Sequence, residues 1–120
     1  MQESMQGIKR SYKCAELSSN NIGEKVTVMG WVQKRRNLGS LLFIDLRDVS
    51  GIVQIMFDET KSDSAVFEKA NSIRSEFVIA VTGTVVKRSG AVNKDLKTGE
   101  IEIEAESLRI LSASDTPPFP

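Results

Sequence analysis

The chain has 120 residues and a mass of 13.2 kDa, with 16 Lys and Arg residues against 16 Asp and Glu residues. This length is typical of one domain and excludes an enzyme that carries a separate substrate domain. The net charge of zero excludes a protein that coats nucleic acid through bulk positive charge, but it allows a local basic patch.

The residue types also restrict the chemistry. The chain has no His and one cysteine, Cys14, which excludes a Ser-His-Asp triad, a disulfide within the chain and a thiolate metal cluster. No apolar run approaches the roughly 20 residues that cross a bilayer, and residues 1–10 lack the apolar stretch of a secretory signal. We therefore expect a cytoplasmic protein without a membrane partner.

Three stretches alternate with the period of a β-strand: residues 24–36, 40–48 and 52–58. The turn between the second and third, residues 48–51, ends in Gly51, which tolerates a positive φ, and it therefore predicts a hairpin. In the first stretch Val26, Val28, Gly30 and Val32 form one alternating set. In the other two, the residues expected to face the core are Leu42, Ile44, Leu46, Val53, Ile55 and Phe57.

The second half of the chain predicts one helix and two more strands. Residues 62–74 have helical spacing, with Ser62 or Asp63 as the N-cap. Residues 77–86 are rich in β-branched types, a polar loop covers 87–99, and a last strand begins near Glu100 with a bulge near Ser107.

This order predicts an all-β fold with one helix. Three strands, a helix and two strands are the order of the OB-fold, a five-stranded Greek-key barrel whose second and third strands and neighbouring loops bind oligonucleotides or oligosaccharides. We expect the barrel to cover residues 24–112. An N-terminal tail and lead-in segment over residues 1–23 precedes it, and a proline-rich segment over residues 113–120 follows it.

Phe43 and Gln54 stand out because the strand period points both away from the core, on neighbouring strands. A base stacks on such a ring, and an amide beside it offers both a donor and an acceptor to a base edge. The alternative is that Phe43 is covered by the N-terminal segment or by a partner domain.

Two basic segments accompany this pair. One includes Arg36 and Asn37 and enters a short turn at Leu38, and the other is the loop that carries Arg88 and Asn93. Guanidinium groups at a strand end clamp phosphates or stack on bases. The alternative for both segments is a solvated loop tip that keeps the protein soluble.

Acidic residues allow two further interpretations. The alternating glutamates from Glu100 to Glu106 predict a solvent-facing strand edge, although a carboxylate such as Glu102 can accept hydrogen bonds from the N1 and N2 groups of guanine. Asp45, Arg47 and Asp48 resemble a catalytic cluster, but their place on a hairpin favours a set of ion pairs that stabilise the turn.

The motifs resemble the N-terminal anticodon-binding domain of bacterial-type aspartyl-tRNA synthetases. The resemblance covers nearly the whole chain. It rests on CAEL at 14–17, GWVQKRRNLGSLLFIDLRD at 30–48, GIVQ at 51–54, VTGTV at 81–85, TGEIE at 98–102 and PPFP at 117–120, the last resembling the start of a hinge to a catalytic domain.

The resemblance implies a role for each matching position. Phe43 would stack on the central uridine of a GUC or QUC anticodon, and Gln54 would hydrogen-bond that base. Glu102 would read the first base, and the turn of Arg36, Asn37 and Leu38 would contact the third.

The resemblance also implies what lies outside this chain. The whole enzyme would be a homodimer that uses ATP and Mg²⁺ to attach aspartate to tRNA, whereas this fragment would hold no cofactor, no metal and no catalytic residue. Two alternatives are a sequence-tolerant single-strand binder, which should carry more positive charge, and a protein-interaction barrel that uses Phe43 as an interface anchor.

Overall fold

The structure is a computed structural model, and it describes residues 10–112. The segments 1–9 and 113–120, which include the proline-rich end predicted as a hinge, lie outside the described residues. The elements in chain order are η1 (Cys14–Glu16), η2 (Ser19–Asn21), β1 (Lys25–Asn37), β2 (Leu41–Asp48), β3 (Gly51–Asp58), α1 (Ser64–Asn71), β4 (Val78–Lys87) and β5 (Ile101–Ser112).

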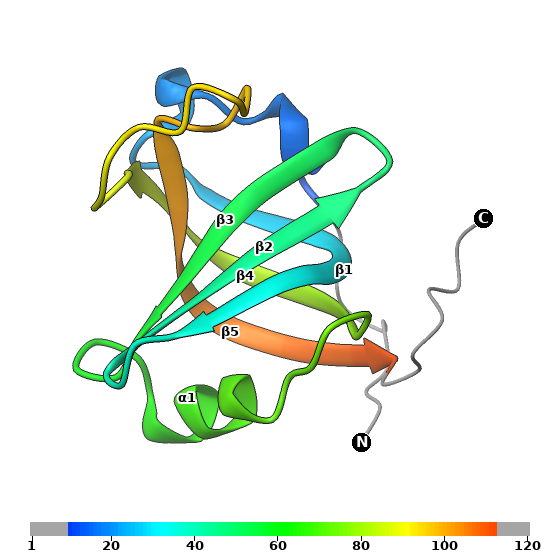
Figure 1. The fold of residues 1–120 in the computed structure, drawn as a ribbon, viewed down its shortest axis with the longest axis vertical. Coiled ribbons are helices and arrows are strands. Elements are labelled where there is room, and N and C mark those ends of the chain that lie inside the picture. Colours follow the sequence, from blue (N-terminus) through cyan, green and yellow to red (C-terminus); the bar gives the residue numbers. More distant parts are fainter. Residues whose placement is uncertain (1–9, 113–120) are drawn as a thin grey trace.

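The five strands close into a barrel in the order β1-β2-β3-β5-β4 (Figure 1). All neighbouring strands are antiparallel except β3 and β5, which run parallel. Strand β1 forms the corner: it pairs with β4 from Lys25 to Trp31 and with β2 from Trp31 to Asn37. The predicted OB-fold, with one helix between the third and fourth strands, is confirmed.

The predicted bulge in the last strand is present. Thr82 of β4 pairs with Ser107, whereas the next residue, Gly83, pairs with Ala105, so that Glu106 is the extra residue on β5. Leu108 is out of phase with Ile101 and Ile103 in the two-residue strand period, and the bulge nevertheless turns its side chain into the core.

Helix α1 is shorter than predicted at both ends. Its N-cap is Asp63, whose carboxylate accepts a hydrogen bond from the Ala65 N–H at 2.9 Å. The helix does not begin earlier, because the residues before Asp63 form a turn whose N–H groups bond the carbonyl of Asp58. After Asn71 the N–H of Ile73 bonds the carbonyl of Ala70, three residues back, which ends the α-helical pattern.

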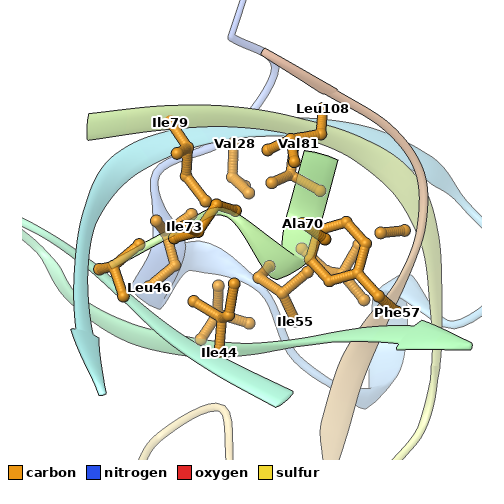
Figure 2. Close-up of a cluster of buried hydrophobic side chains, with 14 of the residues drawn as sticks. Val28, Ile44, Leu46, Ile55, Phe57, Ala70, Ile73, Ile79, Val81 and Leu108 are labelled. Atoms are coloured by element: carbon orange, nitrogen blue, oxygen red, sulfur yellow. The ribbon is translucent and has the colours of Figure 1, made fainter. Parts of the chain in front are cut away.

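Apolar side chains from every strand and from α1 meet inside the barrel (Figure 2). The strand residues predicted to face the core do so, and the helix contributes Phe67 and Ala70 to the same cluster. Helix α1 closes the end of the barrel opposite the β4–β5 connection (Figure 1), and the guanidinium of Arg35 donates to the carbonyl of Asn71 at the end of the helix.

The segment before β1 belongs to the same core. Cys14 and Leu17 are buried in it, and burial, assisted by the nearby carboxylate of Asp48, raises the pKa of the Cys14 thiol. Cys14 is therefore a packed, protonated thiol rather than a nucleophile.

Asp48 is the residue that joins this segment to the barrel. Its carboxylate accepts hydrogen bonds from the Cys14 N–H at 2.8 Å and from the N–H and hydroxyl of Ser50 in the β2–β3 turn, where Gly51 has φ +147°. The predicted turn-stabilising role of Asp48 is confirmed. The predicted ion pairs are wrong: within residues 10–112 Arg47 pairs with neither Asp45 nor Asp48 and instead donates to Gln33.

We expect Asp48→Ala to lower the free energy of unfolding at pH 7 by about 1–3 kcal/mol, because it leaves the buried Cys14 N–H without an acceptor. Burial alone would raise the pKa of Asp48, but the hydrogen bonds from Ser50 and Cys14 hold it below its usual value. The carboxylate therefore stabilises the fold above the unfolded-state pKa of about 3.9 and loses this effect as the pH falls through the lower folded-state value.

Urea denaturation of the wild type and Asp48→Ala across the acid range measures both effects. The difference between the two proteins should narrow below about pH 4, and Glu59→Ala, which changes an exposed carboxylate, should leave stability nearly unchanged. A difference that stays constant with pH would show that the Asp48 carboxylate charge is not what stabilises the turn.

Candidate nucleic-acid interface

A pocket of about 820 Å³ lies between strands β1–β3 and the β4–β5 connection. The barrel supplies one wall, which contains charged, apolar and amide side chains, and residues 88–95 of the connection supply the other. The residues of the barrel wall are Lys34, Arg36, Leu38, Leu41, Phe43, Asp45 and Gln54.

Phe43 lies in this pocket, outside the core cluster, as the strand period predicted. The predicted exposure is wrong, however, because the Phe43 side chain is only 8% exposed. The group that covers it is Arg36, whose guanidinium carbon lies 5.1 Å from the ring centroid in a cation–π contact. Phe43 thus already has a planar cationic group over its ring.

Gln54 is also more enclosed than the sequence indicated, with 3% of its surface exposed. Its amide oxygen accepts hydrogen bonds from Arg36 Nη2 at 3.3 Å and from Arg88 Nη2. Its amide nitrogen donates to Glu102 Oε1 at 2.8 Å. The two arginines and the glutamate come from β1, the β4–β5 connection and β5, so three separate parts of the chain converge on one amide.

Glu102 departs most from its prediction as a solvent-facing residue, because it is fully buried. The parallel pairing of β3 and β5 places it beside Gln54, and the Ser89 hydroxyl contacts its Oε1 at 3.4 Å. Its second oxygen, Oε2, is buried and has no hydrogen-bond partner among residues 10–112. Glu102 is not among the described residues that line the pocket, so it lies behind Gln54.

The remaining predicted residues separate into two groups. Leu38, which is 60% exposed, Arg88 and Asn93 line the pocket. Asn37 does not: its amide bridges the N–H of Gly39 at 2.9 Å and the Asn71 side chain at 3.3 Å, so it shapes the turn that carries Leu38.

The β4–β5 connection is held in place by its own backbone and by the barrel. Hydrogen bonds join Asn93 N–H to Gly99 O at 3.0 Å and Gly99 N–H to Leu96 O at 3.1 Å, and the Thr98 hydroxyl donates to the carbonyl of Ile52 at 2.6 Å. The sequence analysis left two alternatives for this basic loop, an RNA-binding segment or a solvated tip. Sequence reasoning missed the hydrogen bonds of Gln54 with Arg36, Arg88 and Glu102, because no local pattern links these positions.

The pocket therefore combines an aromatic ring, an amide with fixed neighbours and two arginines. Residues 26–111 match the tRNA anticodon family, described as an OB-fold nucleic acid binding domain. The chain belongs to this family. Proteins similar to it include the aspartate–tRNA ligase of Agathobacter rectalis, 66% identical over 119 residues, and the aspartate–tRNA(Asp/Asn) ligase of Lachnoclostridium phytofermentans, 60% identical over 120 residues.

These matches cover 99% and 100% of the chain but 20% of each relative. The chain thus corresponds to the N-terminal fifth of bacterial aspartate–tRNA ligases and is an anticodon-binding OB domain of that type. Within residues 10–112 no helix is long and apolar enough to cross a membrane.

Solved structures agree on the fold. An asparaginyl-tRNA synthetase from Pyrococcus horikoshii complexed with asparaginyl-adenylate matches with a TM-score of 0.74 and 29% identity, over 94% of this chain and 24% of that one. An aspartyl tRNA synthetase from Entamoeba histolytica matches with a TM-score of 0.80 and 21% identity, over 93% and 23% of the two chains. The second likeness, at this identity, supports the fold alone.

Proposed function

We propose that this chain reads the GUC anticodon of aspartate tRNA, or its queuosine form QUC, on behalf of a whole aspartate–tRNA ligase. The observation that carries the proposal is that Phe43 and Gln54 line one pocket beside Arg36 and Arg88. A ring, an amide and two guanidinium groups supply the stacking, the base-edge hydrogen bonds and the phosphate attraction that recognition of unstacked RNA bases requires.

In this proposal the central uridine stacks on Phe43 and bonds Gln54, which requires Arg36 to leave the ring. The exchange is energetically feasible: a cation–π contact contributes about 0.5–2 kcal/mol, and base stacking on an aromatic ring contributes about 1–3 kcal/mol. Arg36, once released, lies at the pocket wall, where a guanidinium can bind a phosphate of the same RNA.

The other contacts follow the geometry of the pocket. Leu38 and Asn37 belong to the turn proposed to meet the third base, with Leu38 in contact and Asn37 shaping the turn. Arg88 and Asn93 close over the RNA from the β4–β5 connection. Contact of Glu102 with the first base requires the groups that bury it to move aside, and the Ser89 hydroxyl at 3.4 Å is one of them.

The remaining chemistry belongs to the whole protein. We propose that it is a cytoplasmic homodimer that activates aspartate with ATP and Mg²⁺ and transfers it to tRNA. Residues 10–112 contain no group of three His, Cys, Asp or Glu side chains arranged to hold a metal ion.

The test is the affinity of an anticodon stem-loop with the sequence GUC, compared with one in which the central base is cytidine. We expect Phe43→Leu, which keeps apolar volume but removes the ring, to weaken binding of the GUC stem-loop by about 5- to 150-fold, the equivalent of losing about 1–3 kcal/mol of stacking. Gln54→Ala should abolish the preference for the central uridine. Fluorescence anisotropy with labelled RNA measures both effects.

Matched variants control for folding. Phe67→Leu replaces a buried ring in α1, on the core side of the barrel, and Gln33→Ala replaces an exposed glutamine whose oxygen accepts from Arg47. Neither should change RNA affinity. Equal affinity for both stem-loops in the wild type would contradict anticodon reading and favour a sequence-tolerant single-strand binder.

A further inference from the structure

The pocket residue Gln54 has its amide oriented from both ends. Arg88 donates to the amide oxygen, and Glu102 accepts from the amide nitrogen. A guanidinium only donates hydrogen bonds and a carboxylate only accepts them. If the amide were turned over, its NH₂ group would face the guanidinium and its oxygen would face the carboxylate, so both ends would be repelled.

The fixed orientation of the Gln54 amide determines which of its hydrogen-bond donors and acceptors are available to a base. The amide oxygen has two lone pairs, one bonded by Arg88 and the other by Arg36. The amide nitrogen has two hydrogens, of which one bonds Glu102. When Arg36 leaves, Gln54 therefore presents one acceptor and one donor, in an order that Arg88 and Glu102 set.

This order distinguishes uracil from cytosine. Uracil presents a donor at N3 and an acceptor at O4, whereas cytosine presents an acceptor at N3 and a donor at N4. In one and the same base position, an amide that accepts from the N3 hydrogen of uracil and donates to O4 meets the reversed pattern in cytosine. A freely rotating amide would turn over and bind either base, but a fixed amide matches only one.

We propose that Arg88 and Glu102 are positioning residues that lock the Gln54 amide and so determine the choice of uridine over cytidine at the central anticodon position. This inference rests on the proposed anticodon function. The inference gives Glu102 a second role. Three observations support this role: Glu102 is completely buried, it bonds Gln54 at 2.8 Å, and it lies behind Gln54 rather than in the pocket lining.

The sharpest test is Glu102→Gln, because a glutamine at this position accepts or donates and no longer opposes the turned-over amide, which then loses only the bond from Arg88. Binding is measured with three stem-loops: GUC, GCC with the central base changed, and CUC with the first base changed. The ratio of GUC to GCC affinity should fall at least about fivefold, the lower end of what one bidentate base contact contributes to discrimination. Stacking on Phe43 should keep the GUC stem-loop bound.

A double-mutant cycle separates positioning from a general structural effect. In a Gln54→Ala background, Glu102→Gln should have no further effect on the GUC to GCC ratio, because the amide that it orients is gone. Glu104→Gln is the matched control: Glu104 lies two residues further along β5 and pairs with Lys61 at 3.5 Å, so the ratio should stay at the wild-type value.

Each outcome decides something different. The positioning role is overturned if Glu102→Gln changes only the ratio of GUC to CUC affinity. It is also overturned if Glu102→Gln still lowers the ratio of GUC to GCC affinity in the Gln54→Ala background. If the wild type binds all three stem-loops equally, the proposed anticodon function itself fails. If denaturation shows Glu102→Gln to be unfolded, Arg88→Ala applies the same test from the other end of the amide, with the ratio again expected to fall and an unchanged ratio overturning the inference.

Discussion

Replacing Gly30 with alanine should destabilise the barrel more than any other change considered, by about 3 kcal/mol or more, the upper end of what an overpacked core position costs. Gly30 lies on β1 just before the strand changes partners from β4 to β2. A Cβ built there would lie 2.2 Å from the carbonyl oxygen of Arg47 and 2.9 Å from its carbon. These are backbone atoms of β2, so relief requires the two strands to separate.

The measurement is chemical denaturation followed by the fluorescence of Trp31, the single tryptophan, which lies next to the substituted position. Gly90→Ala is the matched control, because a Cβ at Gly90 meets nothing within 4 Å. Its unfolding midpoint should stay close to that of the wild type. A Gly30→Ala protein as stable as the Gly90→Ala protein would show that β1 and β2 can move apart at this corner at little cost.

Local patterns were sufficient to predict most of the fold. The two-residue period placed Ile44 and Ile55 in the core and Phe43 outside it, since side-chain direction in a strand depends only on the phase. The same period put Gly30 in one alternating set with Val28 and Val32 but gave no reason for a glycine. That reason is the close approach of β2, which depends on how the barrel closes.

The site was less accessible to prediction from the sequence. The alternating pattern that predicted a surface position for Glu102 is correct for an isolated strand. In the barrel, however, β3 and β5 pair in parallel across a long connection, and this pairing buries Glu102 against Gln54. Arg36 and Arg88 likewise reach Gln54 from segments far apart in the chain. Contacts of this kind depend on tertiary structure. The strand period predicted that Phe43 and Gln54 lie together, and only the resemblance to a family favoured adding Glu102 to that site.

We expect Gly99→Ala to remove most of the RNA affinity while the barrel still folds. A Cβ at Gly99 would lie 1.7 Å from the carbonyl oxygen of Asn93 and 3.1 Å from that of Leu96. It would therefore push apart the turn in which Asn93 and Gly99 bond each other, and displace the wall of the pocket that Asn93 lines. Arg88, at the start of this connection, would lose its place beside Gln54.

The affinity for the GUC stem-loop should fall about tenfold or more, the equivalent of at least about 1.4 kcal/mol. The loss should include the preference for the central uridine, since a displaced Arg88 no longer fixes the Gln54 amide. Denaturation of the same protein tests whether the damage is local. Since the connection adds few residues to the core cluster, the unfolding midpoint of Gly99→Ala should fall less than that of Gly30→Ala. Weakened binding with the uridine preference intact would mean that the connection attracts the RNA without orienting Gln54, so that Glu102 alone sets the direction of the amide.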